Sequence, residues 1–307
     1  MEFQTEAGRF AAADGTAYGN AGETGTYALA AAVNGLAARG VSCTGVEGQI
    51  QIPLEAEFSK AYSMEKILRK ACCKRGIERV ETKIRRNPFL KVPAVTVSAL
   101  GHDLGEPVLQ GGIRPAEGST AVQTEKGESM AAGHEIVLVK WIGMEGMLRI
   151  AGEKEEELRR RFAPVFVRQI QSYRKDLFAG KELEIARNAG VSEVRQITEG
   201  GILAALWELA KESGRGLDLD MKRMSILQET IEVCEQYRVN PYQLTSAGSF
   251  LMVTKEGKKL TDALRRNHIQ ASIIGRMTAG NDKIIHNGGD VRYLDRPAPD
   301  ELYKILL

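Results

Sequence analysis

The sequence is poor in cysteine, which excludes a small protein held together by disulfides. Only four of its 307 residues are cysteine, and none stands in a metal-binding spacing. Cys72 and Cys73 are adjacent within a helical pattern, so we expect reduced, semi-buried thiols. The four histidines are equally scattered, and the sequence therefore predicts no structural zinc site.

Long apolar runs are also missing. No stretch approaches the roughly eighteen apolar residues that a membrane span requires. The first residues, Met-Glu-Phe-Gln-Thr-Glu, lack the basic and then apolar pattern of a signal peptide. We therefore expect a cytoplasmic protein with no membrane partner.

An excess of one charge is the third feature that the chain lacks. It has 42 lysines and arginines against 40 aspartates and glutamates, for a net charge of +2. Hydrophobic residues make up 43% and charged residues 27%, as in an ordinary globular protein. Two small basic clusters, at residues 85–86 and 159–161, are typical of solvated faces. The composition thus predicts no nucleic-acid partner.

The length of the chain is sufficient for two domains, each with its own core. Residues 101–134 are rich in Gly, Pro, Ser and Glu and show almost no apolar periodicity. We predict an N-terminal domain over residues 1–110, a linker over 111–134 and a C-terminal domain over 135–307. Strand and helix patterns alternate in both halves, with hairpins at the edges. This indicates an α+β fold whose sheets are covered by helices on one side.

The first half starts without a clear pattern and then becomes regular. Residues 1–27 are rich in Ala, Gly and Thr, and we expect a loosely ordered start. The periodicity then predicts a helix of small side chains, a strand, a second helix capped by Ser63, and two more strands. These elements cover residues 27–38, 44–52, 64–74, 77–84 and 94–99.

In the second half, a continuous apolar run over residues 135–142 predicts a buried strand, and residues 143–146 predict a turn out of it. A long charged helical region over residues 153–187 is broken near Pro164 and Gly180. The remaining elements alternate: strands over 217–220, 250–254 and 271–276, helices over 228–238 and 257–267, and a terminal hairpin over 283–286 and 291–293.

Residues 195–216 carry both a helix pattern and a candidate site. Thr198 is a good N-cap, and Glu199 would place a carboxylate in the first turn. Apolar residues then recur at three- and four-residue spacing, which predicts an amphipathic helix that ends at Gly214 or Gly216.

Gly200 and Gly201 stand at the start of this predicted helix. Because glycine has no side chain, an anion could come close to their backbone N–H groups, where the helix dipole is positive. A Gly-Gly pair can equally serve only to let the helix pack tightly. Both interpretations stay open at this point.

Several segments between residues 135 and 305 resemble a known superfamily. They include Ile-Val-Leu-Val-Lys-Trp-Ile-Gly-Met-Glu-Gly, Ile-Thr-Glu-Gly-Gly-Ile-Leu-Ala-Ala-Leu-Trp-Glu-Leu-Ala and Asn-Pro-Tyr-Gln-Leu-Thr-Ser-Ala-Gly-Ser. Together they are similar to the aminoimidazole ribonucleotide synthase (PurM-like) superfamily, and within it to the synthase-related branch of HypE-like hydrogenase maturation factors. In the first half, residues 33–40 look like the family's Asn-Asp-Leu-Ala segment and residues 81–84 like its Gly-Asp-Thr-Lys segment.

The resemblance implies a two-domain PurM-like fold. An N-terminal α/β domain would pair with a second subunit into a barrel, making a homodimer, and a C-terminal α/β sandwich would follow. Family members bind ATP with magnesium between the domains, held by aspartates and glycine-rich backbone. By resemblance, the candidate nucleotide- or phosphate-binding residues are Asn34, Thr82, Lys83, Thr198, Glu199, Gly200, Gly201, Ser246 and Gly248. The competing interpretations are a solvated side chain for Lys83 and a tight turn for residues 246–249.

The sequence departs from the family at its carboxylates. Gly35 and Gln196 stand where the family has aspartate, and only Glu81 keeps a charge, as the single candidate metal ligand. Magnesium needs several oxygen anions, so ATP remains the candidate ligand while a tight magnesium site is not expected. Leu306 stands where the maturation factor carries its reactive cysteine, and that factor's thiol chemistry is not expected either.

We therefore predict a degenerate ATP site in a non-catalytic family member, a pseudoenzyme that binds a nucleotide or phosphate weakly or not at all. One alternative is an ATP-dependent enzyme that acts on a small carboxylate or amide, with Glu81 and Glu199 as metal ligands. A second alternative is a partner-binding module in metallocofactor assembly of the kind that hydrogenase maturation requires.

Overall fold

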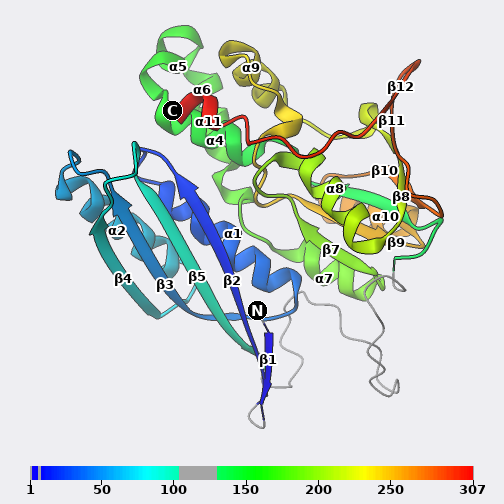
Figure 1. Ribbon diagram of the computed structural model, residues 1–307, viewed down its shortest axis with the longest axis horizontal. Helices are drawn as coiled ribbons and strands as arrows, with labels where there is room; N and C mark the ends of the chain where they lie inside the picture. Colours follow the sequence, from blue (N-terminus) through cyan, green and yellow to red (C-terminus); the bar gives the residue numbers. More distant parts are fainter. Residues whose placement is uncertain (1, 6–7, 104–129, 307) are drawn as a thin grey trace. The chain divides into compact units, whose positions relative to one another are not determined.

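The computed structural model describes residues 2–5, 8–103 and 130–306, and residues 104–129, most of the predicted linker, lie outside them. The fold is α+β, with a five-stranded and a seven-stranded sheet (Figure 1). By contacts, the described chain divides into two compact units. The first holds residues up to 103 together with Glu145–Phe178 and the last residues from Leu302, and the second holds residues 130–144 and Ala179–Glu301. This division differs from the predicted linear boundaries, because residues 145–178 group with the first unit.

The five-stranded sheet belongs to the first unit. Its strand order is β1-β2-β5-β3-β4, and β3 and β4 are parallel while the other neighbours are antiparallel. The strands are β1 (Glu2–Thr5), β2 (Gly8–Tyr18), β3 (Cys43–Ile52), β4 (Arg79–Arg86) and β5 (Ala94–Asp103). The predicted loose start is therefore wrong for residues 8–18, which form strand β2 and pair with β5 from Arg9 to Tyr18.

Small side chains explain why β2 was missed. The helix-facing side of the strand carries only alanine and one glycine, at residues 11, 13, 15 and 17, and it packs against helix α1 (Thr24–Ala38). At Gly15 a Cβ would meet the side chain of Ala31 at 2.8 Å, so only glycine permits this approach of helix and sheet. Such a strand carries no apolar periodicity of the usual β-branched kind.

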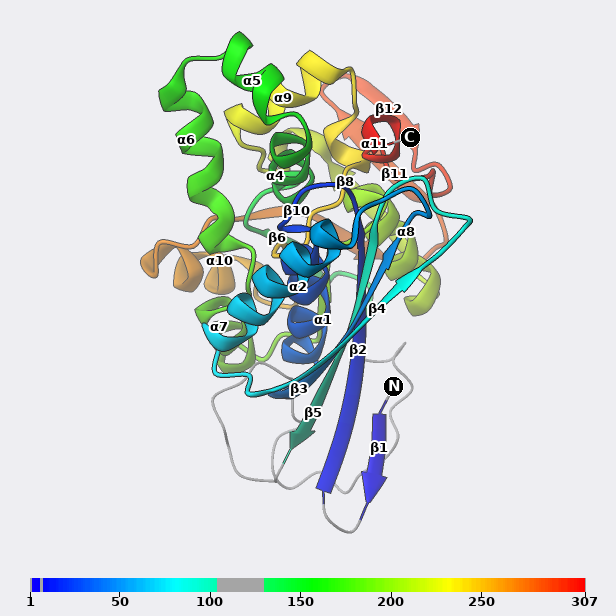
Figure 2. The same cartoon turned by 90° about the vertical axis from the view of Figure 1, so that its left-hand side faces the viewer.

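Both long helices of the first unit cover the same face of this sheet. Gly15, Val97 and Gly48 form one cross-strand row, with Gly15 against α1 and Gly48 against Leu68 of helix α2 (Phe58–Cys73). Figure 2 shows α2 in front of α1. The one-sided cover predicted for the sheets is confirmed for these two helices.

Helix α2 begins six residues before the predicted one, so Ser63 is not its N-cap but an exposed residue within it. The physical reason is Ala61, which is buried with Met64 and Leu68 and extends the sheet-facing stripe towards the N-terminus. Glu57 precedes the helix without a side-chain cap.

The other helices of the first unit are short. Helix α4 (Met144–Glu153) begins where a turn was predicted, and Pro164 starts a helix as its first residue. The rest are α5 (Glu155–Arg161), α6 (Pro164–Ser172), the 3₁₀ turn η1 (Tyr173–Asp176) and α11 (Tyr303–Leu306).

The seven-stranded sheet forms the second unit, with strand order β12-β11-β8-β10-β6-β9-β7. Its strands are β6 (Glu135–Val139), β7 (Glu193–Gln196), β8 (Gly216–Asp220), β9 (Phe250–Thr254), β10 (Ala271–Thr278), β11 (Lys283–Asn287) and β12 (Asp290–Tyr293). The predicted buried strand and terminal hairpin are confirmed, while β7 was not predicted. The other elements are α7 (Lys181–Asn188), α8 (Gly201–Ser213), η2 (Met221–Arg223), α9 (Gln228–Tyr237), η3 (Pro241–Gln243) and α10 (Gly257–Arg266).

This second sheet carries helices on both faces, so its predicted one-sided cover is wrong. Ile136 and Leu138 of β6 join the apolar cluster beneath α8. Glu135 points to the opposite face, where its Oε2 accepts a hydrogen bond from the Gly257 N–H at 2.8 Å, at the start of α10. A strand that is apolar on both faces needs cover on both. No helix in the described parts is long and apolar enough to cross a membrane.

His134, next to β6, is buried at 5% exposure, and neither ring nitrogen has a hydrogen-bond partner in the structure. Burial, aided by Lys255, lowers its pKa below the ordinary 6.5. As pH falls through 6.5 the unfolded chain takes up this proton before the folded chain does, so folding stability must fall. We expect His134→Leu to reduce the decrease in the free energy of unfolding between pH 7 and pH 5, measured by urea unfolding at each pH. An unchanged slope would contradict this assignment.

Candidate functional site

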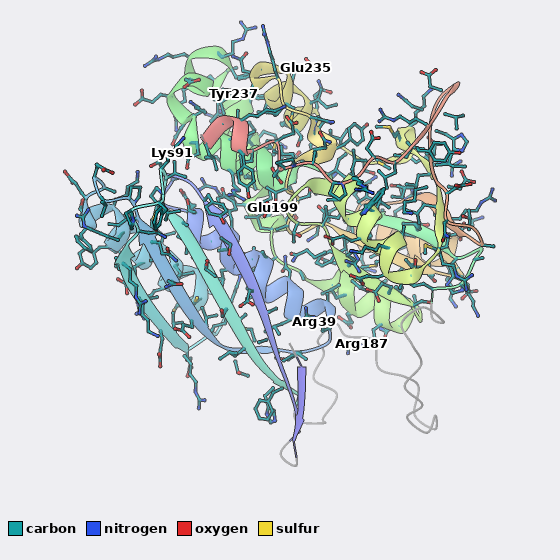
Figure 3. All side chains as sticks on the ribbon, viewed as in Figure 1. Arg39, Lys91, Arg187, Glu199, Glu235 and Tyr237 are labelled. Carbon is teal, nitrogen blue, oxygen red and sulfur yellow. The ribbon has the colours of Figure 1, made fainter. Side chains whose placement is uncertain are left out.

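The loop between β7 and α8 contains the predicted Thr198–Gly201 site residues. Gly200 and Gly201 both have positive φ, +77° and +67°, and Gly200 is the N-cap of α8. Thr198 and Glu199 therefore lie before the helix, and the predicted cap and first-turn carboxylate are wrong (Figure 3 labels Glu199 there). A left-handed residue does not continue a right-handed helix, so this pair of glycines marks the boundary: Gly200 lies outside α8, and Gly201 is its first residue.

Gly201 is held in a tight backbone environment. A Cβ at this position would lie 2.5 Å from the Tyr242 carbonyl oxygen and 2.8 Å from both the backbone nitrogen and oxygen of Leu244. Its N–H donates to the Thr198 carbonyl at 3.1 Å. Close packing, one of the two interpretations of the Gly-Gly pair, thus has direct support at Gly201.

The N–H of Gly200 already has an anionic partner from within the chain. It donates to Oδ2 of Asp300 at 2.8 Å, and Asp300 is buried, with 4% of its surface exposed. A carboxylate is the group that the positive end of α8 favours. The chain therefore supplies its own anion at the place where the sequence predicted an external one.

Asp300 was missed in the sequence. It follows Arg296-Pro-Ala-Pro299, and two prolines within four residues do signal an extended segment. No spacing rule connects residue 300 with residue 200, because their proximity depends on how this segment returns past the end of β12.

The segment from Ser246 to Ser249 is a turn between η3 and β9, and it contacts residues 141–143 that follow β6. Ser246 Oγ accepts a hydrogen bond from the Gly143 N–H at 2.6 Å and donates to the Leu244 carbonyl at 2.9 Å. Ser249 Oγ donates to the Trp141 carbonyl at 2.7 Å. The Gly248 N–H points to Oε1 of Gln196, at 3.4 Å. The turn interpretation is supported, and the buried Ser246 hydroxyl already has both a donor and an acceptor.

This turn lies against the loop that precedes α8, because the Ile197 N–H donates to the Ser249 carbonyl at 2.9 Å. The structure thus brings together the two groups of second-unit candidates, Thr198 to Gly201 and Ser246 with Gly248. Gln196, which replaces a family aspartate, lies between them.

The first-unit candidates do not share one surface. Thr82 and Lys83 are adjacent on β4, so their side chains point to opposite faces of the sheet. The Thr82 hydroxyl donates to Oε1 of Glu65 on α2, and this bond lowers the pKa of that carboxyl. Lys83 forms an ion pair with Glu47 at 2.7 Å on the helix-free face. Asn34 is buried in α1 and donates to the Leu177 carbonyl at 2.8 Å.

The candidate metal ligand Glu81 is exposed on β4, in register with Glu47 of β3. Glu47 is already engaged by Lys83, and that hydrogen bond lowers its pKa. Nowhere in residues 2–5, 8–103 and 130–306 do three His, Cys, Asp or Glu side chains gather in a way that could hold a metal ion.

Comparison with known proteins identifies the family. The model of the AIR synthase related protein, C-terminal domain, matches residues 131–287, about half of the chain, and the chain belongs to this family. Two curated relatives match part of it. Carbamoyl dehydratase HypE of Rhodobacter capsulatus is 25% identical over 128 residues, which cover 39% of this chain and 38% of the relative. Phosphoribosylformylglycinamidine synthase subunit PurL of Methanobrevibacter smithii is 29% identical over 112 residues, 35% of this chain and 14% of the relative.

Solved structures show the same fold over nearly the whole chain. The E. coli hydrogenase maturation protein HypE has a TM-score of 0.66 at 16% identity, covering 97% of this chain and 90% of that one. HypE in complex with ATP has a TM-score of 0.63 at 14% identity, covering 95% and 87%. AaThiL complexed with AMPPCP and TMP also has 0.63, at 13% identity, covering 94% and 86%. The predicted two-domain PurM-like, HypE-like fold is confirmed by these likenesses.

The two glycines that flank α8 provide a matched test of the packing at its start. Gly201 and Gly214 have similar positive φ, but a Cβ on Gly214 would meet nothing within 4 Å. Alanine at either position must adopt a left-handed conformation, and only at residue 201 does it also press on backbone. We expect Gly201→Ala to cost about 1–3 kcal/mol more than Gly214→Ala in urea unfolding. Equal losses would show that the loop moves freely.

Proposed function

We propose that this protein is a non-catalytic member of the AIR synthase-related family whose nucleotide site is degenerate. One observation carries the proposal: the buried Asp300 carboxylate accepts a hydrogen bond from the Gly200 N–H at the start of α8. A second anion brought there would face this carboxylate, and like charges at such a distance repel. The segment that resembles the family's glycine-rich run is thus occupied by the protein itself.

The remaining candidate groups support the same proposal. The Gly201 N–H, the Ser246 hydroxyl, the Thr82 hydroxyl and the Asn34 amide each have an internal hydrogen-bond partner. Using any of them for a ligand would first break that bond, and a buried group left without a partner costs about 1–3 kcal/mol. Gly35 and Gln196 add no charge where the family has aspartates. HypE and AaThiL have been solved with ATP and with AMPPCP, so the proposed loss would distinguish this chain from those two proteins of the same fold.

We expect the purified protein neither to release phosphate from ATP with magnesium nor to be stabilised thermally by ATP. Asp300→Ala removes the internal anion, so it should lower the stability by about 1–3 kcal/mol and make the melting temperature rise with added phosphate or ATP. Asp295→Ala, a change at an exposed neighbour, is the matched control and should behave as the wild type.

Magnesium-dependent turnover by the wild type would overturn the proposal and favour the ATP-dependent enzyme. Phosphate stabilisation of the wild type as strong as that of Asp300→Ala would show that the carboxylate does not occupy the site. Both outcomes are read from the same titrations.

We also propose that the protein is a homodimer that pairs through the helix-free face of the five-stranded sheet. Phe10 and Leu100 are exposed on this face, and the Phe10 ring stacks on His102 across strands β2 and β5 with centroids 4.2 Å apart. A sheet face with large apolar side chains gains free energy when a second surface covers it. The proposal rests on this exposure together with the shared fold.

Leu100→Glu tests the dimer because it puts a charge in the centre of this face. We expect sedimentation velocity to show a dimer for the wild type and a monomer for the variant. Val165→Glu, at an exposed position on α6, should leave the dimer intact. A wild-type monomer at concentrations of tens of micromolar would refute the proposal.

A further inference from the structure

Positive charge is concentrated in one part of a nearly neutral chain. Residues 58–91, which span α2, β4 and the turn that follows, contain eleven lysines and arginines but three glutamates. The whole chain has 42 cations against 40 acidic residues, so this segment differs sharply from the average. Local charge of this density steers and selects binding partners.

A single ridge of α2 presents three of these cations on one helix face. Phe58, Tyr62, Lys66, Lys70 and Lys74, the α2 ridge, follow one another at four-residue intervals from the first residue of the helix to its C-cap. All five are exposed, and Figure 2 views α2 with α1 behind it. Residues four apart lie on one helix face with a rise of about 6 Å, so the ridge offers two aromatic rings followed by three ammonium groups.

The other cations of α2 and Arg75 just after it have partners, whereas the ammonium groups of these three lysines have no ion pair or hydrogen bond within the described residues. Arg69 bonds to Glu65 and to the Val80 carbonyl. Arg75 lies over the Phe178 ring at 3.0 Å, and burial lowers its pKa to about 10. Lys60 donates to Asn20. The helix dipole accounts for lysines near the C-terminus but not for exposed aromatic rings at the other end.

The aromatic end of the ridge is larger than its two helical residues. Phe58 and Tyr62 lie with ring centroids 6.3 Å apart, and they are 41% and 60% exposed. Arg86 lies over the Phe58 ring at 4.7 Å, beside the turn that carries Phe89, which is 93% exposed. Figure 3 labels Lys91 in this turn. Apolar rings left in water at this density mark a contact surface rather than a solvated face.

We propose that the α2 ridge binds an acidic amphipathic helix of a partner protein. A helix that packs alongside α2 in the antiparallel direction would place aspartates or glutamates of its own N-terminal half opposite Lys66, Lys70 and Lys74. Apolar residues of its C-terminal half would cover Phe58 and Tyr62. This orientation agrees with the dipole rule, because acidic residues favour the N-terminal half of a helix. Matching four-residue ridges is also how helices commonly pack.

The three cations of the α2 ridge are all lysines, which favours a protein partner over a nucleic acid. Phosphate groups are commonly recognised by arginine in bidentate geometry, whereas the α2 ridge presents only lysine. A convex helix also offers no groove in which successive bases could stack, the arrangement that single-strand binders use. Carboxylates on a helix need point charges at regular spacing, which the α2 ridge provides.

The test uses the full chain and a labelled synthetic peptide with glutamates at three four-residue intervals in its N-terminal half and leucine and phenylalanine in its C-terminal half. We expect fluorescence anisotropy to show salt-sensitive binding of this peptide. Replacing Lys66, Lys70 and Lys74 by glutamate should weaken it about tenfold or more, since three attractions become repulsions. Replacing Lys255, Lys258 and Lys259, exposed lysines at and before α10, changes the net charge equally and should have little effect.

Two further arms keep the proposal falsifiable. The glutamine variant of the three α2 lysines preserves helix propensity, so its binding loss is informative even if the glutamate variant folds poorly. A scrambled peptide of the same composition should bind at least several-fold more weakly. Equal peptide binding by the variant of the three α2 lysines and by the control variant at residues 255, 258 and 259 would overturn the proposal. Tighter binding of a single-stranded dT oligonucleotide than of the peptide would overturn it as well.

Discussion

The hydrogen bond between the Gly200 N–H and the Asp300 carboxylate fixes the start of α8. A helix leaves its first N–H groups without partners inside the helix, and at a buried start an acceptor must come from elsewhere. Here it comes from a residue one hundred positions later, so the segment after β12 is tied to the loop after β7. The same carboxylate gives the positive helix end its counter-charge, and this structural bond is the observation on which the proposed function rests.

Glycine supports that arrangement by allowing backbones to approach closely. Gly201 lies against the backbone of Tyr242 and Leu244, where any side chain would collide. In the first unit Gly15 and Gly48 play the corresponding role under α1 and α2. In the first unit glycine lets a helix approach the sheet, and in the second unit it lets the start of α8 approach the backbone of residues 242–244.

Much of the fold could be predicted from the pattern of residues. The strands at 135–139 and 250–254 and the helix ending before Gly214 were predicted because apolar periodicity and stop residues are local signals. β2 could not be predicted this way, because alanine and glycine give a strand no apolar signature and its order comes from pairing with β5. Ser63 was a plausible cap in sequence, but burial of Ala61 extended the helix past it.

The residue pattern alone was sufficient for the family resemblance, for the alternation of strands and helices, and for the expectation that Gly35 and Gln196 stand where the resembled family has aspartate. Those features depend on residue type and short-range spacing. The tertiary structure decided whether the Gly-Gly pair faces a ligand or another part of the chain, which side of β4 Thr82 and Lys83 occupy, and that Asp300 is the partner of α8. These outcomes depend on contacts between residues far apart in sequence, and no local pattern encodes which buried donor meets which distant acceptor.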